Sequence, residues 1–194
     1  MFNLFNFLTY AVITAITPGP NNIMSMSIAR QYGFKRSLPF NFGVFAGFSV
    51  VMLICTYFFA TLSSVIPMIK APMILIGAIY MLYLAWITFK STSKIEESHV
   101  SSGFLNGLML QFINPKVYLY CLISMEVYIL PNFSRQPGIL FAFALLLALI
   151  GFGFTLCWSV FGTLFQRLFS TYAQLINTIL ALLLVYCAIA LFFE

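Results

Sequence analysis

The sequence has almost no acidic residues. It contains no Asp, only four Glu and one His, and charged residues make up 7% of its 194 positions. Ordinary soluble domains carry about 25% charged residues, because water must solvate most of their surface. This scarcity of charge excludes a water-soluble enzyme, a disordered chain and a nucleic-acid-binding protein.

Side chains for catalysis and metal binding are equally scarce. The single His99 lies in a polar segment, and without Asp no conventional catalytic triad can be built. The four cysteines lie in apolar stretches, at spacings that fit neither a metal site nor a disulfide framework. We interpret them as small hydrophobic core residues. The sequence therefore predicts no enzyme activity, no cofactor and no metal site.

Hydrophobic residues are abundant instead, at 62% of the chain. A bilayer core about 30 Å thick is crossed by about 20 apolar residues in a helix. Helices satisfy their own backbone hydrogen bonds, which lipid cannot do. The sequence thus predicts an all-α membrane protein with six transmembrane helices. These spans are expected at Leu4–Ala29, Leu38–Ile66, Ala71–Phe89, Phe104–Glu126, Gly138–Phe165 and Thr171–Phe193.

The basic residues between these spans predict the orientation. Cytoplasmic loops carry an excess of Lys and Arg, and six such residues follow the first, third and fifth spans against two on the opposite side. Both termini are therefore expected outside. The six are Arg30, Lys35, Arg36, Lys90, Lys94 and Arg167, and the two are Lys70 and Arg135.

The two halves of the chain resemble each other within a single transmembrane domain, residues 1–194. A polar linker at 91–102 separates a first repeat of about 1–90 from a second of about 103–194. Pro18 in the first span precedes Pro115 in the fourth by 97 residues. Three spans per half is an odd number, so the halves are expected to insert with opposite orientations, as in many secondary transporters.

The first span contains a strong helix break. Pro18 and Pro20 each lack a backbone donor, Gly19 between them permits close approach of other groups, and Asn21 and Asn22 follow. A helix restarting at Pro20 would present free N–H groups and a positive dipole end, which suit a carboxylate. We predict a substrate-binding site at these five residues. The alternative is a proline kink that only shapes helix packing.

The fourth span contains a second break. Gln111, Asn114, Pro115 and Lys116 occur together about two to three turns into the span. A charged side chain at that depth costs at least about 2.5–3.5 kcal/mol and usually has a function. We predict that these residues bind substrate and that Lys116 also serves in coupling. The alternative is that Lys116 extends its ammonium to the membrane interface.

Other polar and small residues in the spans have less specific interpretations. Glu126 is the single acid within a predicted span, and it lies near the outer end, where solvation competes with a coupling role. Tyrosines such as Tyr120 are able to hydrogen-bond a ligand, although most pack or lie at interfaces. Small residues in spans two and five favour close helix packing; they are Gly43, Gly47, Gly151 and Gly153.

These motifs resemble those of the LysE/RhtB superfamily of amino-acid exporters. The resemblance rests on TPGPNN at the first break, GAIYMLYLAW at Gly77–Trp86 and INPK at Ile113–Lys116, and it runs nearly end to end. The stretches ITAITPGPNNIMS, LQFINPKVYLY and ALLLVYCAIALFF are similar to the branch that exports cysteine and O-acetylserine. The resemblance implies an inner-membrane secondary exporter that uses neither ATP nor a bound cofactor.

The combined expectation is an exporter of small neutral amino acids, foremost cysteine and O-acetylserine. Proton exchange is the expected driving force, and a homodimer is compatible with the sequence. A zwitterion needs an anion receptor, supplied by the helix restart and Lys116. It also needs acceptors for its ammonium, from Asn, Gln and Tyr side chains or carbonyls freed by the prolines. Export of homoserine, threonine or another amino acid is the alternative, followed by a non-transporting assembly protein.

Overall fold

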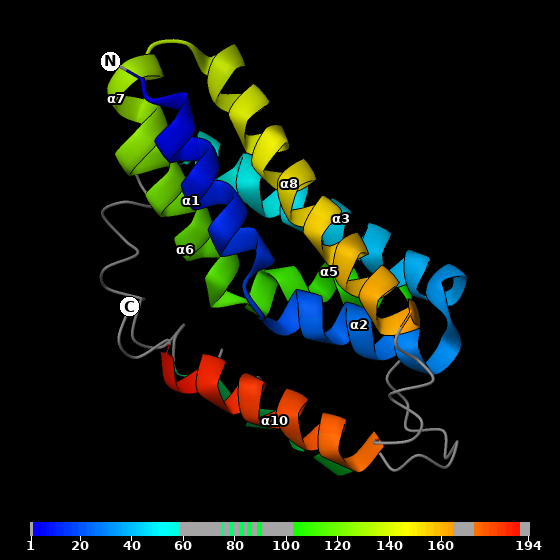
Figure 1. Ribbon diagram of the computed structural model, residues 1–194. Coiled ribbons are helices and arrows are strands. Elements are labelled where there is room, and N and C mark those ends of the chain that lie inside the picture. Colours follow the sequence, from blue (N-terminus) through cyan, green and yellow to red (C-terminus); the bar gives the residue numbers. More distant parts are fainter. Residues whose placement is uncertain are drawn as a thin grey trace.

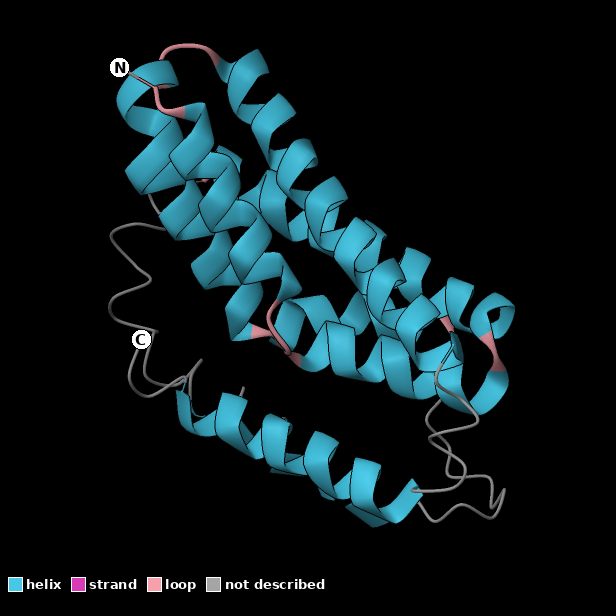
Figure 2. Cartoon of the chain, viewed as in Figure 1, coloured by secondary structure: helices cyan, strands magenta, loops and turns pink. Residues whose placement is uncertain are grey.

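The structure is a computed structural model that describes residues 2–58, 103–164 and 173–190, with single residues between 75 and 90. Every regular element in these residues is a helix, and they contain no strand (Figure 2). The predicted all-helical class is therefore confirmed. The linker expected at 91–102 lies outside the described residues.

The first predicted span is two helices. Helix α1 (Leu4–Ile16) begins after Asn3, whose side chain accepts a hydrogen bond from the N–H of Asn6 at 3.1 Å. Helix α2 (Pro20–Tyr32) begins directly after Gly19. Proline suits the first position of a helix, because the N–H there has no partner within the helix. The break is thus confirmed, and α2 continues past the expected end at Ala29 to Tyr32.

Helix α3 (Phe34–Tyr57) follows α2 after a single residue. That residue, Gly33, has a φ of +84°, in the left-handed region that glycine occupies readily. The predicted start at Leu38 is wrong, because Gly33 makes the turn and the helix passes through Pro39. The last part of that predicted span, from residue 59 onward, lies outside the described residues.

The fourth predicted span is bent. Helix α5 (Phe104–Ile113) ends at Asn114, and helix α6 (Pro115–Ile123) starts immediately after it. The helices on either side of Asn114 are bent by 62°. A π-helix, η1 (Ser124–Ile129), and α7 (Leu130–Phe133) continue the path. The predicted end at Glu126 is therefore wrong: the π-helix carries the apolar run onward.

Two long helices complete the second half of the chain. Helix α8 (Pro137–Leu164) has 28 residues and α10 (Ala173–Ala190) has 18. By length and composition α3 and α8 can each cross a bilayer, and the bent segment from α5 to α7 makes a third candidate. The described residues of the third predicted span, which lie between 75 and 90, are helical. The described helices thus provide two or three candidate spans, against the six that the sequence predicts.

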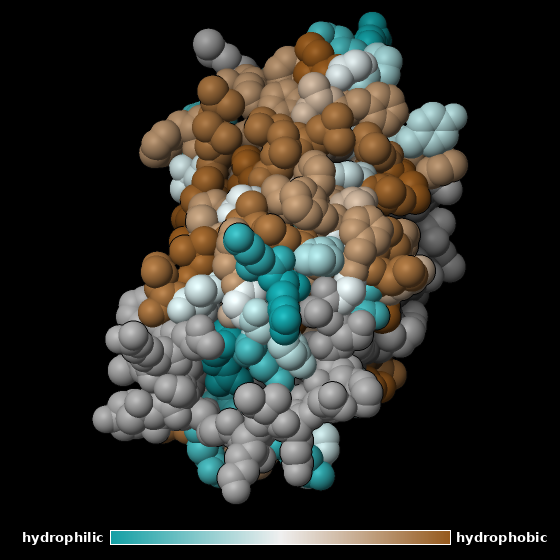
Figure 3. Space-filling view, turned by 90° about the vertical axis from the view of Figure 1, so that its right-hand side faces the viewer, coloured by the Kyte–Doolittle hydropathy of each residue, from teal (hydrophilic) through white to brown (hydrophobic). Residues whose placement is uncertain are grey.

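The helices bring the two breaks side by side. Helix α3 packs most extensively against α5 and α8, and α2 packs against α8. Figure 1 shows α1 beside α6, and the turn from α1 to α2 next to the turn from α5 to α6. Helix α10 lies beyond α2, and Arg30 donates a hydrogen bond to the side chain of Asn177 between them. Figure 3 shows a broad apolar area on one face, with hydrophilic side chains gathered below it.

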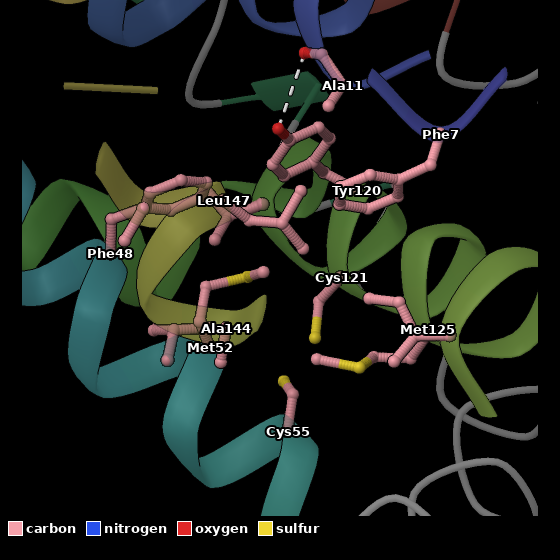
Figure 4. Packing of buried hydrophobic residues seen from close by; sticks show 14 residues of the cluster. Phe7, Ala11, Phe48, Met52, Cys55, Tyr120, Cys121, Met125, Ala144 and Leu147 are labelled. Carbon is pink, nitrogen blue, oxygen red and sulfur yellow. Dashed lines mark hydrogen bonds between the residues drawn. The ribbon is translucent and has the colours of Figure 1, made fainter. Parts of the chain in front are cut away.

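Two buried apolar clusters lie on either side of this region. The first joins α1, α3, α6, η1 and α8 and is drawn in Figure 4; it includes Phe7, Phe48, Met52, Tyr120, Met125 and Leu147. The second joins α2, α3, α5 and α10; it includes Ile23, Met26, Phe40, Val44, Leu110 and Leu184. At each break, therefore, one helix belongs to the first cluster and the other helix to the second.

The cysteines are only partly core residues. Cys55 and Cys121 are buried in the first cluster, where Figure 4 shows their sulfur atoms pointing toward each other. This confirms the interpretation for these two. Cys157 is exposed on α8, so the interpretation is wrong there. Helix α8 is long and apolar enough to cross a membrane, and little of its most apolar stretch is buried inside the protein. The side chain of Cys187 lies outside the described residues.

Three of the four glycines noted in the sequence allow close packing. A Cβ atom on Gly43 would lie 1.9 Å from the carbonyl oxygen of Phe104, and one on Gly47 2.6 Å from that of Leu108. A Cβ atom on Gly151 would lie 2.7 Å from the ring of Phe48, whereas one on Gly153 would meet no described atom within 4 Å. The close approach of the α3 and α5 backbones therefore depends on glycine, and nothing described packs against Gly153.

We expect Gly43→Ala to destabilise the folded protein, because the new methyl group would overlap the backbone of α5. Overpacking of this kind costs about 1–3 kcal/mol, and more where backbone must move. The thermal unfolding midpoint of the purified protein in detergent measures the effect. Gly153→Ala is the matched control and should leave the midpoint unchanged or raise it, since alanine favours a helix. Equal midpoints for both variants would contradict the close approach.

Candidate functional site

Lys116 joins the two helix breaks. Its ammonium donates hydrogen bonds to the hydroxyl oxygen of Thr17 at 2.7 Å and to the carbonyl oxygen of Thr17 at 3.1 Å. Thr17 lies between α1 and α2, and Lys116 is the second residue of α6. Residues 99 positions apart in the chain thus form one site.

Amide side chains form a second connection between the breaks. The side-chain nitrogen of Asn21 donates to Gln111 Oε1 at 2.8 Å, and that of Gln111 donates back to Asn21 Oδ1 at 3.0 Å. Asn114 also donates to Asn21 Oδ1, at 3.3 Å. This reciprocal pairing satisfies both amides and fixes the start of α2 against the end of α5.

The carbonyl groups at the end of α1 already have donors. Asn22 Nδ2 donates to the oxygens of Ala15 and Thr17, at 2.8 and 3.0 Å. The indole N–H of Trp158 donates to the oxygen of Ile16 at 3.2 Å. These carbonyl oxygens therefore already accept from the protein's own donors, and their use by a substrate ammonium stays a prediction.

The two helix starts differ in how they are capped. At α6, the Asn114 side chain accepts from the N–H of Lys116 at 3.1 Å, so the cap is internal. At α2, Gly19 provides no side-chain cap. The N–H groups of Asn21 and Asn22, in the first turn, have no acceptor among the described residues. The positive end of α2 is consequently available to an anion.

A hollow of about 470 Å³, including its mouth, lies at this helix start. Five helices and both breaks contribute to it. Among the described residues that line it, Lys116 is the only charged one, and none is acidic. Its lining contains both polar and apolar side chains. The polar ones are Thr14, Asn21, Asn22, Asn114, Lys116 and Thr155, and the residues that we call the apolar wall are Val44, Phe48, Val117 and Tyr120.

Most of the predicted site residues lie at this hollow. Those that line it are Gly19, Pro20, Asn21, Asn22, Asn114 and Lys116. Gln111 and Pro115 are buried next to it without lining it, and Pro18 is also outside the lining. Glu126 is exposed on η1 and does not line the hollow. A Cβ atom on Gly19 would lie 3.2 Å from Lys116 Nζ, so glycine leaves room for the ammonium.

The sequence prediction omitted Thr17, Thr155 and Trp158. Thr17 stands in the first motif but lacked an assigned role, although it holds Lys116. Thr155 lines the hollow from α8 and donates to Gly151 O at 2.9 Å. Its signal was available: Thr155 and Ser159 are four residues apart on one face of an otherwise apolar helix. Nothing in the sequence singled out Trp158 from packing aromatics.

Known proteins share this chain's sequence over nearly its whole length. The family model described as LysE type translocator matches residues 12–194. Proteins named cysteine/O-acetylserine efflux protein are similar: one from Klebsiella pneumoniae is 42% identical over 97% of this chain and 96% of its own. One from Escherichia coli K12 is 38% identical over 96% of both chains. No solved structure matches the chain significantly. On the family match and these identities, the chain belongs to the LysE family of translocators.

Proposed function

We propose that this protein exports small neutral amino acids, foremost cysteine and O-acetylserine, through the hollow at the two helix breaks. The observation that carries the proposal is the pairing of an uncapped helix start with Lys116 at one hollow that no described acidic side chain lines. The names of the relatives supply the two candidate substrates.

The carboxylate of the substrate would bind at the start of α2. This carboxylate would accept hydrogen bonds from the N–H groups of Asn21 and Asn22. It would also lie near the Lys116 ammonium, which would donate to both the carboxylate and Thr17. A charge-assisted hydrogen bond is shorter and about twice as strong as a neutral one. An anionic group is therefore favoured here, and a basic amino acid, which adds a second cation, is disfavoured beside Lys116.

The side chain of the substrate would lie against the apolar wall. Phe48 and Tyr120 stack with ring centroids 5.8 Å apart, and Val44 and Val117 also line the hollow. The hydroxyl of Tyr120 is engaged, because it donates to Ala11 O at 3.3 Å. This wall is suited to a thiol or an acetyl ester rather than to a charged side chain.

The proposal includes the membrane arrangement expected from the sequence. Six spans form two inverted repeats in the inner membrane, with both termini outside, and alternating access moves the repeats about the hollow. Proton exchange drives export. Lys116 and Tyr120 are the two titratable side chains among the lining residues, and of these Lys116 is the candidate for coupling.

The test is counterflow of labelled O-acetylserine in proteoliposomes containing the purified protein. We expect unlabelled cysteine and O-acetylserine to compete. O-acetylethanolamine, which keeps the ester and ammonium but lacks the carboxylate, should compete at least 10-fold less well. Lysine should also be a poor competitor. The expectation follows because a hydrogen bond to a charged group contributes about 1.5–3 kcal/mol and about 1.4 kcal/mol is tenfold.

The outcomes separate the alternatives. Stronger competition by homoserine or threonine would move the substrate assignment within the same class. Equal competition by O-acetylethanolamine and O-acetylserine would show that no carboxylate receptor exists and would contradict the site. Absence of any amino-acid exchange would overturn the transport function itself.

A further inference from the structure

A second buried polar cluster lies outside the hollow. It consists of Ser25 from α2, Ser37 and Asn41 from α3, and Ser159 from α8, and all four have 0% exposure. We call these residues the serine–asparagine cluster. The hydroxyl of Ser25 donates to Asn41 Oδ1 at 2.6 Å, and the hydroxyl oxygens of Ser25 and Ser159 are 2.6 Å apart. Asn41 Nδ2 donates to Ser159 at 2.8 Å.

The cluster lies one helical turn from the hollow on three helices. Asn22, Val44 and Thr155 line the hollow, and Ser25, Asn41 and Ser159 are three or four residues away from them. Gly33 joins the end of α2 to the start of α3. Going from Asn22 to Ser25 on α2, or from Val44 to Asn41 on α3, therefore leads toward the basic residues around Gly33. On α8 the step leads the same way: Gly162, about one turn beyond Ser159, lies so close to α2 that a Cβ atom on it would be 2.4 Å from the carbonyl oxygen of Met26. The cluster thus lies on the basic side of the hollow, the side expected to be cytoplasmic.

The cluster gathers oxygen atoms around one hydroxyl group. Ser25 Oγ lies within hydrogen-bond distance of Asn41 Oδ1, the Thr155 carbonyl oxygen at 3.0 Å and Ser159 Oγ, and either of the two serine hydroxyls can donate to the other. The hollow differs, because its start of α2 and its Lys116 present donors. A zwitterion needs both. The three oxygens around Ser25 match the three protons of an ammonium group.

The closed cluster is suited to opening. A purely apolar barrier would pack equally well in a membrane protein, but separating it would expose apolar surface to water. Here each side chain has a hydrogen-bond partner while the helices are together, and water or a ligand replaces that partner when they separate. The residue types therefore fit a surface that alternates between contact and exposure.

We propose that the serine–asparagine cluster is the ammonium subsite for the incoming amino acid, reached when α2 moves away from α3 and α8. This inference rests on the proposed export function. In the present state the cluster's oxygens, only 2.6 Å apart, bond to one another and leave no room for a ligand. In the open state Asn41 Oδ1 and the oxygens around Ser25 accept from the ammonium, before the carboxylate settles at the start of α2.

The first test compares one protein before and after cross-linking. Ser25→Cys and Ser159→Cys are combined in a variant whose four native cysteines are replaced by alanine. O-acetylserine, which has no thiol, is the transported probe. We expect oxidation to a disulfide to reduce counterflow at least 10-fold and a reductant to restore it, while each single cysteine variant is insensitive to oxidant. Unchanged counterflow by the cross-linked protein would overturn the movement of α2.

The second test separates binding from helix packing. Asn41→Leu removes the acceptor and keeps the side-chain size. We expect it to raise the concentration of O-acetylserine needed for half-maximal exchange about 10-fold. Competition by 3-acetoxypropionate, the same molecule without the ammonium, should be unchanged. A purely structural role would weaken both ligands equally, and that result would overturn the subsite. If the unaltered protein exchanges neither ligand, the proposed function fails and the subsite with it.

Discussion

Lys116→Met is expected to reduce export about 10- to 100-fold with little loss of fold stability. Methionine keeps an unbranched side chain beside Gly19 but removes the charge and both hydrogen bonds to Thr17. The carbonyl of Thr17 keeps its second donor, Asn22 Nδ2, so the end of α1 stays satisfied. Burying an ammonium in a membrane protein is itself costly, and its removal therefore should not lower the unfolding midpoint. Counterflow and thermal unfolding of the same preparation measure both effects.

Two further variants define what the charge does. Lys35→Met removes a lysine that is exposed at the start of α3 and should leave counterflow unchanged. Lys116→Arg keeps the charge but replaces the compact ammonium beside Gly19 with a larger, planar guanidinium, so partial activity is expected. The decisive measurement is how much better O-acetylserine competes than O-acetylethanolamine. If this preference is the same in Lys116→Met as in the unaltered protein, the Lys116 ammonium is not part of the carboxylate receptor.

The helix breaks could be located from the sequence because their chemistry is local. Proline lacks the backbone N–H wherever it occurs, so Pro20 and Pro115 start new helices in the structure as expected. The predicted span start at Leu38 and the predicted span end at Glu126 are wrong for a related reason. A proline near a helix start and an acid in an apolar run are weak signals, and both helices continue through them.

The contacts between the breaks depended on tertiary structure. A sequence places Asn21 and Gln111 in two broken spans, but not which amide pairs with which. The capping difference was likewise hidden: Asn114 bonds to its own helix, whereas Asn22 turns back to the end of α1. Only the folded chain reveals that α2 retains the free N–H groups.

The serine–asparagine cluster shows which signal was missed. Its residues are ordinary in type, and each alone reads as a small polar residue in a span. Their spacing is informative, since Ser37 and Asn41 are four residues apart on α3 and hence on one face. A search for polar pairs at helical spacing inside apolar spans would have found this pair and Thr155 with Ser159.

Asn22→Asp is expected to abolish detectable export, with a loss of more than 100-fold. Asn22 is 5% exposed, and its side-chain nitrogen donates to two carbonyl oxygens. In aspartate a carboxylate oxygen would face both carbonyls, so two attractive contacts become repulsive. The new negative charge would also occupy the start of α2, where we place the carboxylate of the substrate. Leaving buried acceptors unsatisfied costs about 1–3 kcal/mol, and repulsion of the substrate adds to that loss.

A change of specificity separates this repulsion from simple misfolding. In Asn22→Asp the hollow would hold a carboxylate of its own, so O-acetylethanolamine, a cation, should bind better than O-acetylserine. Asn22→Ala loses the same two hydrogen bonds without the charge and should weaken binding of O-acetylserine without this inversion. Asn132, which donates to Tyr128 O at 3.2 Å away from the hollow, provides the control Asn132→Asp. Ligand-induced shifts of the unfolding midpoint measure binding in all three variants, even where export has stopped. Equal preference for O-acetylserine in Asn22→Asp and in the unaltered protein would place the carboxylate elsewhere, because a charge at the start of α2 must repel an anion bound there.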